Sequence, residues 1–337
     1  MRTLVTGGFG FIGSVLCKEL HRAGWEIRIV DIEDKSKSNI EFGRFDYIVG
    51  DIVDYSTVLK ATEGIDLIIH LAAKHRFFGI SKDEFYRVNV EGTKAILKAA
   101  SQRNIKNIIF YSSVAVYGDQ SVPTNENTIP KPDNTYGITK FEAEKLVCNW
   151  VSERENRNAL IIRPTVVFGP NNKGNMYRLI RQIDKRLYIP IGSGKNIKSV
   201  AYVENLVNAT LFLMNKGFKG LEVYNYADEP HRTFREIVDL IYRLSGRSAP
   251  KLSLPVKPVL MSLRPFDYLA KLLGINFPIP IALMKMNTPT HHTASKIRKA
   301  GFQQIHSFEE GLACMIDWYK KNKENKEVER TSNEVEG

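Results

Sequence analysis

A tyrosine and a lysine four residues apart are the strongest candidates for chemistry in this sequence. Tyr136 and Lys140 enclose Gly137-Ile138-Thr139, and side chains at positions i and i+4 of a helix project from the same face. A free tyrosine has a pKa of about 10 and is a poor base at neutral pH, but a neighbouring ammonium group favours its ionised form. The pair therefore predicts a tyrosine that acts as general acid and base, tuned by Lys140. A Tyr/Lys pair that stands alone is usually a surface pair, so the prediction depends on what accompanies it.

A serine supplies a third group. Ser113 follows the apolar run that begins at Asn107, and the carboxyl ends of parallel strands form the edge at which such sheets bind ligands. A hydroxyl can both donate and accept a hydrogen bond at a reacting oxygen. We expect Ser113 to orient a substrate hydroxyl whose proton Tyr136 exchanges.

A glycine cluster near the start of the chain predicts a dinucleotide site. Gly7, Gly10 and Gly13 have the spacing G-x-x-G-x-x-G between an apolar run and a helical pattern. Gly7 permits a tight turn, Gly10 lets a diphosphate approach the backbone, and Gly13 lets the helix pack closely on the strand. The helix that opens at Phe11 and Ile12 would face the diphosphate with free N–H groups and a partial positive charge.

Residues at the ends of the next strands extend this site. Asp31 stands 18 residues after Gly13, where a carboxylate can accept hydrogen bonds from both ribose hydroxyls and repel a 2′-phosphate. Ile32 rather than arginine follows it, so NAD is favoured over NADP; the alternative is a solvated aspartate at a strand end. Further expected contacts are Asp51 and Ile52 at the adenine, Leu71, Ala72 and Ala73 beside the cofactor, and Lys140 at the nicotinamide ribose, although the small residues could equally serve packing alone.

These side chains need a scaffold of alternating strands and helices. Short apolar runs predict buried strands, and helical periodicity appears between them, so we expect an α/β fold with a doubly wound parallel sheet over residues 1–170. A smaller mixed α/β substrate lobe, interleaved with the sheet, is expected over 171–320 and a disordered charged tail over 321–337. The expected strands are 3–6, 26–30, 66–71, 107–112, 160–163 and 221–226, and the expected helices are 12–23, 83–103, 134–155, 176–185, 203–215, 234–245 and 308–320.

The composition excludes several classes of protein. The chain has 337 residues, of which 43% are hydrophobic and 25% charged, as in water-soluble globular proteins. It has no apolar run that could span a membrane and no signal peptide at Met1. Three cysteines without paired spacing predict neither a disulfide framework nor a zinc site, and a cytoplasmic location is expected. The adjacent His291 and His292 suggest a metal only weakly, and we expect none.

The net charge of +11 is unevenly distributed. Residues 240–299 hold ten Lys or Arg and one acid, an excess that attracts nucleic acid, phosphorylated metabolites or an anionic membrane. Within it, residues 252–286 combine apolar residues with Lys and Arg, and their prolines prevent a spanning helix. This composition suits either peripheral contact with an anionic membrane or a lid over the substrate. Residues 171–199 hold seven Lys or Arg and one acid, so a substrate diphosphate is expected there, with Lys173, Asn175 and Arg178 as first candidates.

Together these motifs resemble the extended short-chain dehydrogenases/reductases that act on nucleotide sugars, the NAD-dependent epimerases and dehydratases. The resemblance implies a Rossmann-type domain, abstraction of hydride from a sugar carbon by NAD, and a cofactor contact at Asn89. Dehydratases of the family carry an Asp-Glu pair where Val114 and Ala115 stand, so a dehydratase is rejected. The resemblance extends to about Tyr319 and is carried by the glycines, Leu71–Ala73, Asn89–Thr93, Ser112-Ser113 with Val116–Gly118, Tyr136–Lys140, and Arg163-Pro164 with Phe168–Pro170.

The second half resembles one group within that family, bacterial 4-epimerases that act on N-acetylglucosamine linked through diphosphate to undecaprenol in surface polysaccharide or O-antigen synthesis. In that half the likeness is carried by Arg163–Pro170 with Val166 in place of the common asparagine, Lys173–Asn175, Lys198–Val203 and Tyr224–Tyr226, and Lys74–Arg76 in the first half add to it. It implies a 4-keto intermediate. Besides the basic candidates Lys173, Asn175 and Arg178, substrate contacts are expected at Ser113 and Tyr202, and at His75 and Arg76, which follow the carboxyl end of a strand and could meet the sugar or a phosphate.

Alternatives remain open at this point. A UDP-sugar 4-epimerase would also retain its NAD, and a UDP-4-keto-sugar reductase would consume reduced cofactor. A non-catalytic NAD sensor or a nucleic-acid-binding relative is disfavoured by the intact Ser113, Tyr136 and Lys140. Relatives often dimerise through the helices expected at 83–103 and 134–155, so a homodimer is expected.

Overall fold

The computed structural model describes residues 1–34, 45–75, 80–120, 123–273 and 279–335. The chain divides into two compact units, and the one that holds the main sheet comprises Met1–Val167, Ala201–Asp228 and His292–His306. The lobe expected over 171–320 was expected to be interleaved with the sheet. Two segments of this range, 201–228 and 292–306, lie in the sheet unit, because 221–226 forms a strand of that sheet and Phe302 packs into its core.

Seven strands form the main sheet of this unit, in the order β10-β6-β5-β4-β1-β2-β3. All neighbours run parallel, as the alternation of strands and helices predicted. The strand bounds are β1 Arg2–Thr6, β2 Glu26–Asp31, β3 Asp46–Val49, β4 Leu67–His70, β5 Asn107–Tyr111, β6 Asn158–Pro164 and β10 Leu221–Tyr226.

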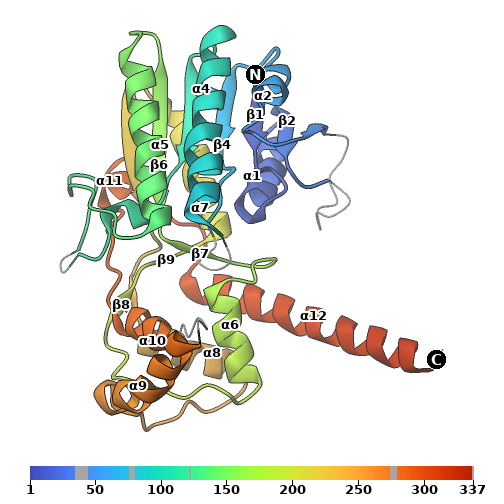
Figure 1. Cartoon of the computed structure of the whole chain (residues 1–337). Helices are drawn as coiled ribbons and strands as arrows, with labels where there is room; N and C mark the ends of the chain where they lie inside the picture. Colours follow the sequence, from blue (N-terminus) through green and yellow to red (C-terminus); the bar gives the residue numbers. More distant parts are fainter. Residues whose placement is uncertain (35–44, 76–79, 121–122, 274–278, 336–337) are drawn as a thin grey trace. The chain divides into compact units, whose positions relative to one another are not determined.

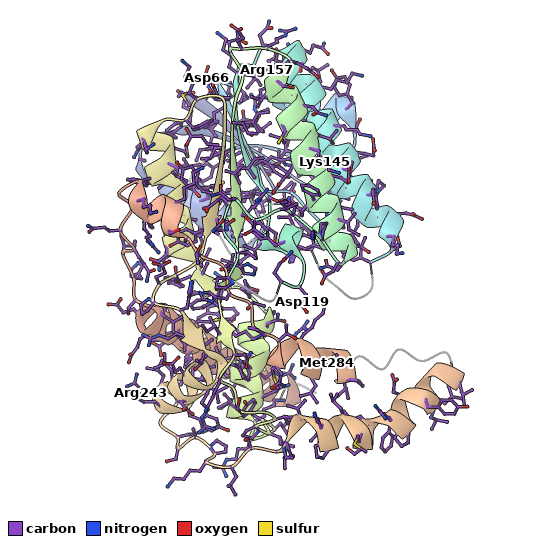
Figure 2. All side chains as sticks on the ribbon, turned by 90° about the vertical axis from the view of Figure 1, so that its left-hand side faces the viewer. Asp66, Asp119, Lys145, Arg157, Arg243 and Met284 are labelled. Atoms are coloured by element: carbon purple, nitrogen blue, oxygen red, sulfur yellow. The ribbon has the colours of Figure 1, made fainter. Side chains whose placement is uncertain are left out.

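Helices bury both faces of the sheet, so successive residues of a strand enter different cores. Val5 and Ile69 pack with α1 (Phe11–Arg22) and α7 (Val203–Lys216). Leu4 and Ile68 pack on the opposite face. The helices of that face are α2 Tyr55–Ala61, α4 Gly92–Gln102 and α5 Thr135–Ser152. Figure 1 shows α4 and α5 side by side, and Figure 2 shows the side chains that fill the space beneath them.

Two departures from regular helix occur beside this layer. The single helix expected over 83–103 is α3 (Lys82–Tyr86), a π-helical turn η2 (Arg87–Glu91) and α4. Such π turns often occur at functional sites. A second short element, the 3₁₀ turn η3 (Val114–Tyr117), follows β5.

The other unit is mainly helical. Its helices α6, α8 and α12 pack together, as do α9 and α10, and β8 pairs antiparallel with β11. The sequence assigned no helix to the α9 and α10 regions. The bounds are α6 Asn175–Asp184, α8 Phe234–Leu244, α9 Val256–Leu272, α10 Ile279–Asn287, α12 Phe308–Val335, β8 Ile197–Lys198 and β11 Arg232–Thr233; β7 (Val166–Phe168), β9 (Val200–Tyr202) and α11 (Ser295–Lys299) complete the chain.

The end of α12 differs from the sequence expectation. Disorder was expected over 321–337, whereas the helix continues to Val335. Residues 321–335 contain neither proline nor glycine and are rich in lysine and glutamate, which are good helix formers. Among the described residues, every helix is too short or too polar to cross a lipid bilayer.

Candidate active site

Ser113 and Tyr136 meet because two elements approach closely. Ser113 caps η3, and its Oγ accepts a hydrogen bond from the Ala115 N–H at 3.1 Å. Asn134 caps α5 by accepting from the Gly137 N–H at 3.0 Å. A Cβ at Gly137 would lie 2.3 Å from the Ala115 carbonyl oxygen, so only glycine lets α5 begin against η3. A hydrogen bond then joins the side chains of Ser113 and Tyr136.

Burial dominates the electrostatics of the Tyr136/Lys140 pair. Burial raises the pKa of Tyr136, and the hydrogen bond with Ser113 opposes this only in part. Lys140 is 2% exposed, and burial lowers its pKa to about 7 against the opposing effect of the Glu144 carboxylate. A lysine that is only partly charged at neutral pH stabilises a phenolate less than a fully charged one. The protein groups alone therefore do not lower the pKa of Tyr136.

A buried ion pair lies one helical turn beyond Lys140. The Glu144 carboxylate accepts two hydrogen bonds from the Arg163 guanidinium, at 2.8 and 2.6 Å, and both side chains are buried. Arg163 also donates to the Tyr117 hydroxyl at 2.8 Å. Lys140 itself contacts an aromatic ring: its Nζ lies 4.2 Å from the centroid of the Phe110 ring, a cation–π distance. The sequence analysis missed Glu144, although it continues the i, i+4 spacing of Tyr136 and Lys140.

A second buried network was also missed, and it starts behind the glycine loop. The Ala72 N–H donates to Thr6 Oγ1 at 3.2 Å, and Thr6 Oγ1 is 2.7 Å from His70 Nδ1. His70 Nε2 is 3.1 Å from Thr93 Oγ1, which donates to the Asn89 carbonyl at 2.7 Å. Burial, with the nearby charge of Lys140, lowers the pKa of His70 to about 3, so the ring is neutral. Because the Thr93 proton is used, Nε2 must donate and Nδ1 accept, and all four bonds point the same way.

Asn89 carries this network into α5. It is buried, its Oδ1 accepts from the Lys74 N–H at 2.8 Å, and its Nδ2 donates to the Lys74 carbonyl at 3.1 Å. The remaining Nδ2 proton goes to Thr139 Oγ1 at 3.0 Å, and Thr139 donates to the Tyr136 carbonyl at 3.1 Å. Both amide protons of Asn89 are thus used within the protein. Its visible role is to hold the loop after β4 against the helix that carries Tyr136.

The glycine loop has the shape that a dinucleotide diphosphate requires. Gly7 has a φ of +72°, and a Cβ there would lie 2.9 Å from the Ala72 backbone. A Cβ at Gly13 would lie 2.2 Å from the Gly7 carbonyl oxygen, whereas Gly10 is exposed and has only that oxygen nearby. No side chain caps the start of α1, where Phe11 and Ile12 lie. The first N–H groups of that helix are therefore available to an anion beside Gly10.

Asp31 closes this loop from β2. Its carboxylate accepts from the Phe9 N–H at 2.9 Å and from the Glu33 N–H at 3.1 Å. Burial raises the pKa of Asp31, and these N–H donors oppose the rise. Each carboxylate oxygen retains acceptor capacity for a ribose hydroxyl. Ile32 beside it is 60% exposed and offers no charge to a 2′-phosphate.

The other candidate cofactor residues vary in their exposure. Asp51 is partly exposed and forms an ion pair with Arg87 at 2.8 Å. Ile52 is buried in the core beneath α2 and α4. Leu71, Ala72 and Ala73 directly follow β4 and are partly exposed.

The candidate substrate residues fall into two groups. His75 is exposed, Tyr202 is buried with its N–H donating to the Asp228 carboxylate at 2.6 Å, and Arg76 lies outside the described residues. In the second unit, Lys173, Asn175 and Arg178 are exposed around the N-terminus of α6.

The described residues contain no cluster of three or more His, Cys, Asp or Glu that could hold a metal ion. His292, singled out in the sequence, is buried, and its Nδ1 lies 2.6 Å from Thr124 Oγ1.

Comparison with known proteins agrees with this geometry. Residues 3–227 match the family described as the NAD dependent epimerase/dehydratase family. The chain is 33% identical over 311 residues to the N-acetyl-alpha-D-glucosaminyl-diphospho-ditrans,octacis-undecaprenol 4-epimerase of Escherichia coli O157:H7, covering 92% of each chain. It is 30% identical over 282 residues to the UDP-N-acetyl-alpha-D-glucosaminuronate decarboxylase of Bacillus cytotoxicus, covering 77% of this chain and 84% of the relative.

Solved structures show the same fold. The UDP-glucuronic acid 4-epimerase of Bacillus cereus, solved in complex with NAD, superposes with a TM-score of 0.77 at 23% identity, covering 95% of this chain and 99% of the other. The family match spans the glycine loop, Asp31, Asn89, Ser113, Tyr136 and Lys140. The chain is therefore a member of the NAD-dependent epimerase/dehydratase family.

Proposed function

We propose that this protein is an NAD-dependent 4-epimerase of an N-acetylhexosamine carried on diphosphate, interconverting GlcNAc-diphospho-undecaprenol and GalNAc-diphospho-undecaprenol for surface polysaccharide synthesis. The observation that carries the proposal is the 33% identity to the undecaprenol-linked 4-epimerase of E. coli over 92% of both chains. The side chains proposed to do the chemistry, Ser113, Tyr136 and Lys140, are present and gathered beside the carboxyl end of β5.

The reaction assigns one task to each of these residues. Ser113 holds the C4 hydroxyl of the sugar by hydrogen bonding, and Tyr136 removes the hydroxyl proton as the C4 hydride leaves, giving a 4-keto sugar. Tyr136 returns its proton when hydride comes back to the other face of C4. Because Tyr136 both takes and gives this proton, the protein ends each cycle in its starting state.

The glycine loop, Asp31 and the residues after β4 fit NAD, as the exposed Gly10 at the start of α1 and the carboxylate of Asp31 indicate. Bound NAD would supply the hydride acceptor and donor, together with the positive charge that the protein groups alone do not give Tyr136. Lys140 would hold the nicotinamide ribose. Asn89 would position the loop after β4 rather than bind through its own amide protons.

In the second unit, Lys173, Asn175 and Arg178 are proposed to bind the substrate diphosphate. All three are exposed at the start of α6, where free N–H groups and basic side chains favour an anion. His75 and Arg76 are proposed to contact the sugar or a phosphate.

A UDP-linked sugar is the second candidate substrate. It is favoured by the relative from B. cytotoxicus, 30% identical over 282 residues, whose name specifies a UDP-linked sugar. With such a substrate the same residues would serve a UDP-sugar 4-epimerase, or a reductase of a UDP-4-keto sugar.

The test presents purified protein with lipid-linked and UDP-linked N-acetylglucosamine in parallel and follows the configuration at C4 by NMR. We expect turnover of the lipid-linked sugar without consumption of added NADH. Turnover of the UDP sugar alone would refute the lipid carrier, and stoichiometric loss of NADH would identify a reductase.

Two variants control this test. Tyr136→Phe should abolish turnover with the fold intact, because it removes only the proton-transferring oxygen. Tyr47→Phe makes the same change at a tyrosine that is 40% exposed on β3 and should retain full activity. Full activity of Tyr136→Phe would refute the mechanism.

Assembly and location also remain proposals. We propose a homodimer through α4 and α5 and a cytoplasmic location. Sedimentation of the purified protein at several concentrations tests the first, and a monomer throughout would refute it.

A further inference from the structure

The exposed apolar side chains of the second unit are concentrated in one stretch. Of 21 large apolar side chains that are exposed among the described residues, ten lie between Leu252 and Met284. The stretch includes α9 and α10, which pack against each other (Figure 1). Single exposed apolar residues are ordinary, but a contiguous group of them marks a surface that binds another protein or a membrane.

One side of α9 packs against its own unit. Its partly buried residues recur at intervals of three and four, as expected for one face of a helix. Val256 opens this face and lies 3.0 Å from where a Cβ at Gly192 would be. The residues of this inner face are Val256, Val259, Leu260, Leu263 and Asp267.

The opposite side of α9 is a second apolar stripe. Its residues are also spaced by three and four, but they point away from the inner face, because at 100° per residue the two sets lie half a turn apart. Exposed fractions of 63% at Met261, 66% at Tyr268 and 66% at Leu272 show that the stripe is open. This outer stripe comprises Met261, Pro265, Tyr268, Leu269 and Leu272.

Basic residues border the outer stripe. Lys257 and Arg264 are both exposed and stand seven residues apart, which places them on the same edge of the helix. Lys251, which lies before α9, and Lys285, which lies in α10, are also exposed. The one acid of α9, Asp267, is on the inner face.

We propose that the outer stripe of α9 docks on an anionic lipid bilayer, with the apolar residues inserted at the level of the headgroups and the basic residues beside lipid phosphates. A helix in the membrane plane needs this pairing of an apolar face with cations at its border. Tyr268 suits the boundary, since its ring is apolar and its hydroxyl can remain hydrated.

Charge distinguishes this occupant from a second copy of the chain. If two copies paired through the stripe, each would bring cations and no acid to the interface, and like charges would face each other. A bilayer rich in anionic lipid supplies the opposite charge. The inference goes beyond the proposed function, because a membrane surface can be bound without any sugar substrate.

The experiment is flotation of the full-length protein with vesicles of phosphatidylcholine alone or mixed with phosphatidylglycerol. We expect flotation only with the mixed vesicles, and loss of it at high salt. The double variant L269S/L272S should abolish flotation. The variant K257Q/R264Q should weaken it about fivefold for each cation removed.

A matched control changes apolar residues that are equally exposed elsewhere. Ile129 and Leu187 are 72% and 68% exposed, and I129S/L187S should float as the wild type does. Circular dichroism and thermal melting confirm that each variant is folded.

Three outcomes would overturn the proposal: no flotation of the wild type, equal flotation of L269S/L272S, or equal binding to neutral vesicles. Self-association that L269S/L272S abolishes, without flotation, would assign the stripe to a second copy instead. Each of these readouts is independent of turnover, so failure here is distinguishable from failure of the proposed function.

Discussion

Replacing Lys140 by methionine should stabilise the protein, and by an amount that depends on pH. Methionine is similar in length but has no charge to bury. The pKa of Lys140 falls from 10.5 to about 7 on folding, and a difference of this size corresponds to about 5 kcal/mol. Lys140→Met therefore removes the free-energy cost of burying this charge in the folded protein.

The sign follows from proton binding. Between about pH 7 and pH 10.5 the unfolded chain holds a proton on Lys140 that the folded chain does not, so wild-type stability rises with pH across this window. Below about pH 7 Lys140 is protonated in both the folded and the unfolded chain, and the folded chain bears the full free-energy cost of burying the charge. The stabilisation by Lys140→Met should therefore be about 5 kcal/mol at low pH and should shrink toward zero near pH 10.5.

The assay is urea denaturation of nucleotide-free wild type and variant at several pH values across this window. Taking the difference between the two proteins cancels the other titrating groups, such as Cys17, whose thiol pKa burial raises. Lys145→Met is the matched control, because Lys145 is on the same helix but 51% exposed (Figure 2). Parallel stability curves for wild type and Lys140→Met would refute the reasoning, since they would mean that Lys140 titrates as in solution.

Three further predictions concern the surroundings of this site. Gly13→Ala should weaken NAD binding more than tenfold in a fluorescence titration, because its Cβ would lie 2.2 Å from the Gly7 carbonyl oxygen and force the loop to move; unchanged affinity would contradict the tight packing. Glu144→Gln should destabilise the protein by about 3–5 kcal/mol in urea, because it leaves the buried Arg163 charge without a carboxylate, whereas Glu142→Gln, which removes an ion pair with Lys145 that is exposed on both sides, should cost under about 1 kcal/mol; equal effects would be inconsistent with a buried pair. Asn89→Ala should lower kcat at least tenfold and cost about 1–3 kcal/mol for each polar group left without a partner; normal kcat with saturating NAD would remove its positioning role.

The sequence was sufficient for residues whose chemistry depends on local spacing. The i, i+4 interval joined Tyr136 to Lys140, and the glycine intervals identified the loop before α1, because one helix or one turn fixes these relations. The parallel sheet was predicted because short apolar runs alternate with helical patterns. Such runs are continuous, rather than polar at every second residue, because helices bury both faces of the sheet. The fold class was predictable for the same reason.

The buried networks could not be predicted, because they join residues that only the sheet brings together. Thr6 and His70 are 64 residues apart in the chain and meet at adjacent strands. The low pKa of Lys140 likewise arises from burial, which spacing does not reveal. Helix α9 was not predicted. It contains Pro258 in its first turn, where the missing N–H has no helical partner to lose, and Pro265 in its interior.

The late position of β10 in the chain affects how the sheet can form during translation. While the ribosome is still making the middle of the protein, β6 has emerged but β10, its neighbour in the finished sheet, has not. The hydrogen-bonding edge of β6 is then open to strands from other nascent chains. The core layer that contains Val5 and Ile69 is also incomplete at this stage, because Ile297 and Phe302, which belong to it, are translated near the end. Until β10 and these two residues have been made, the edge of β6 and this hydrophobic layer lack the partners that cover them in the folded protein.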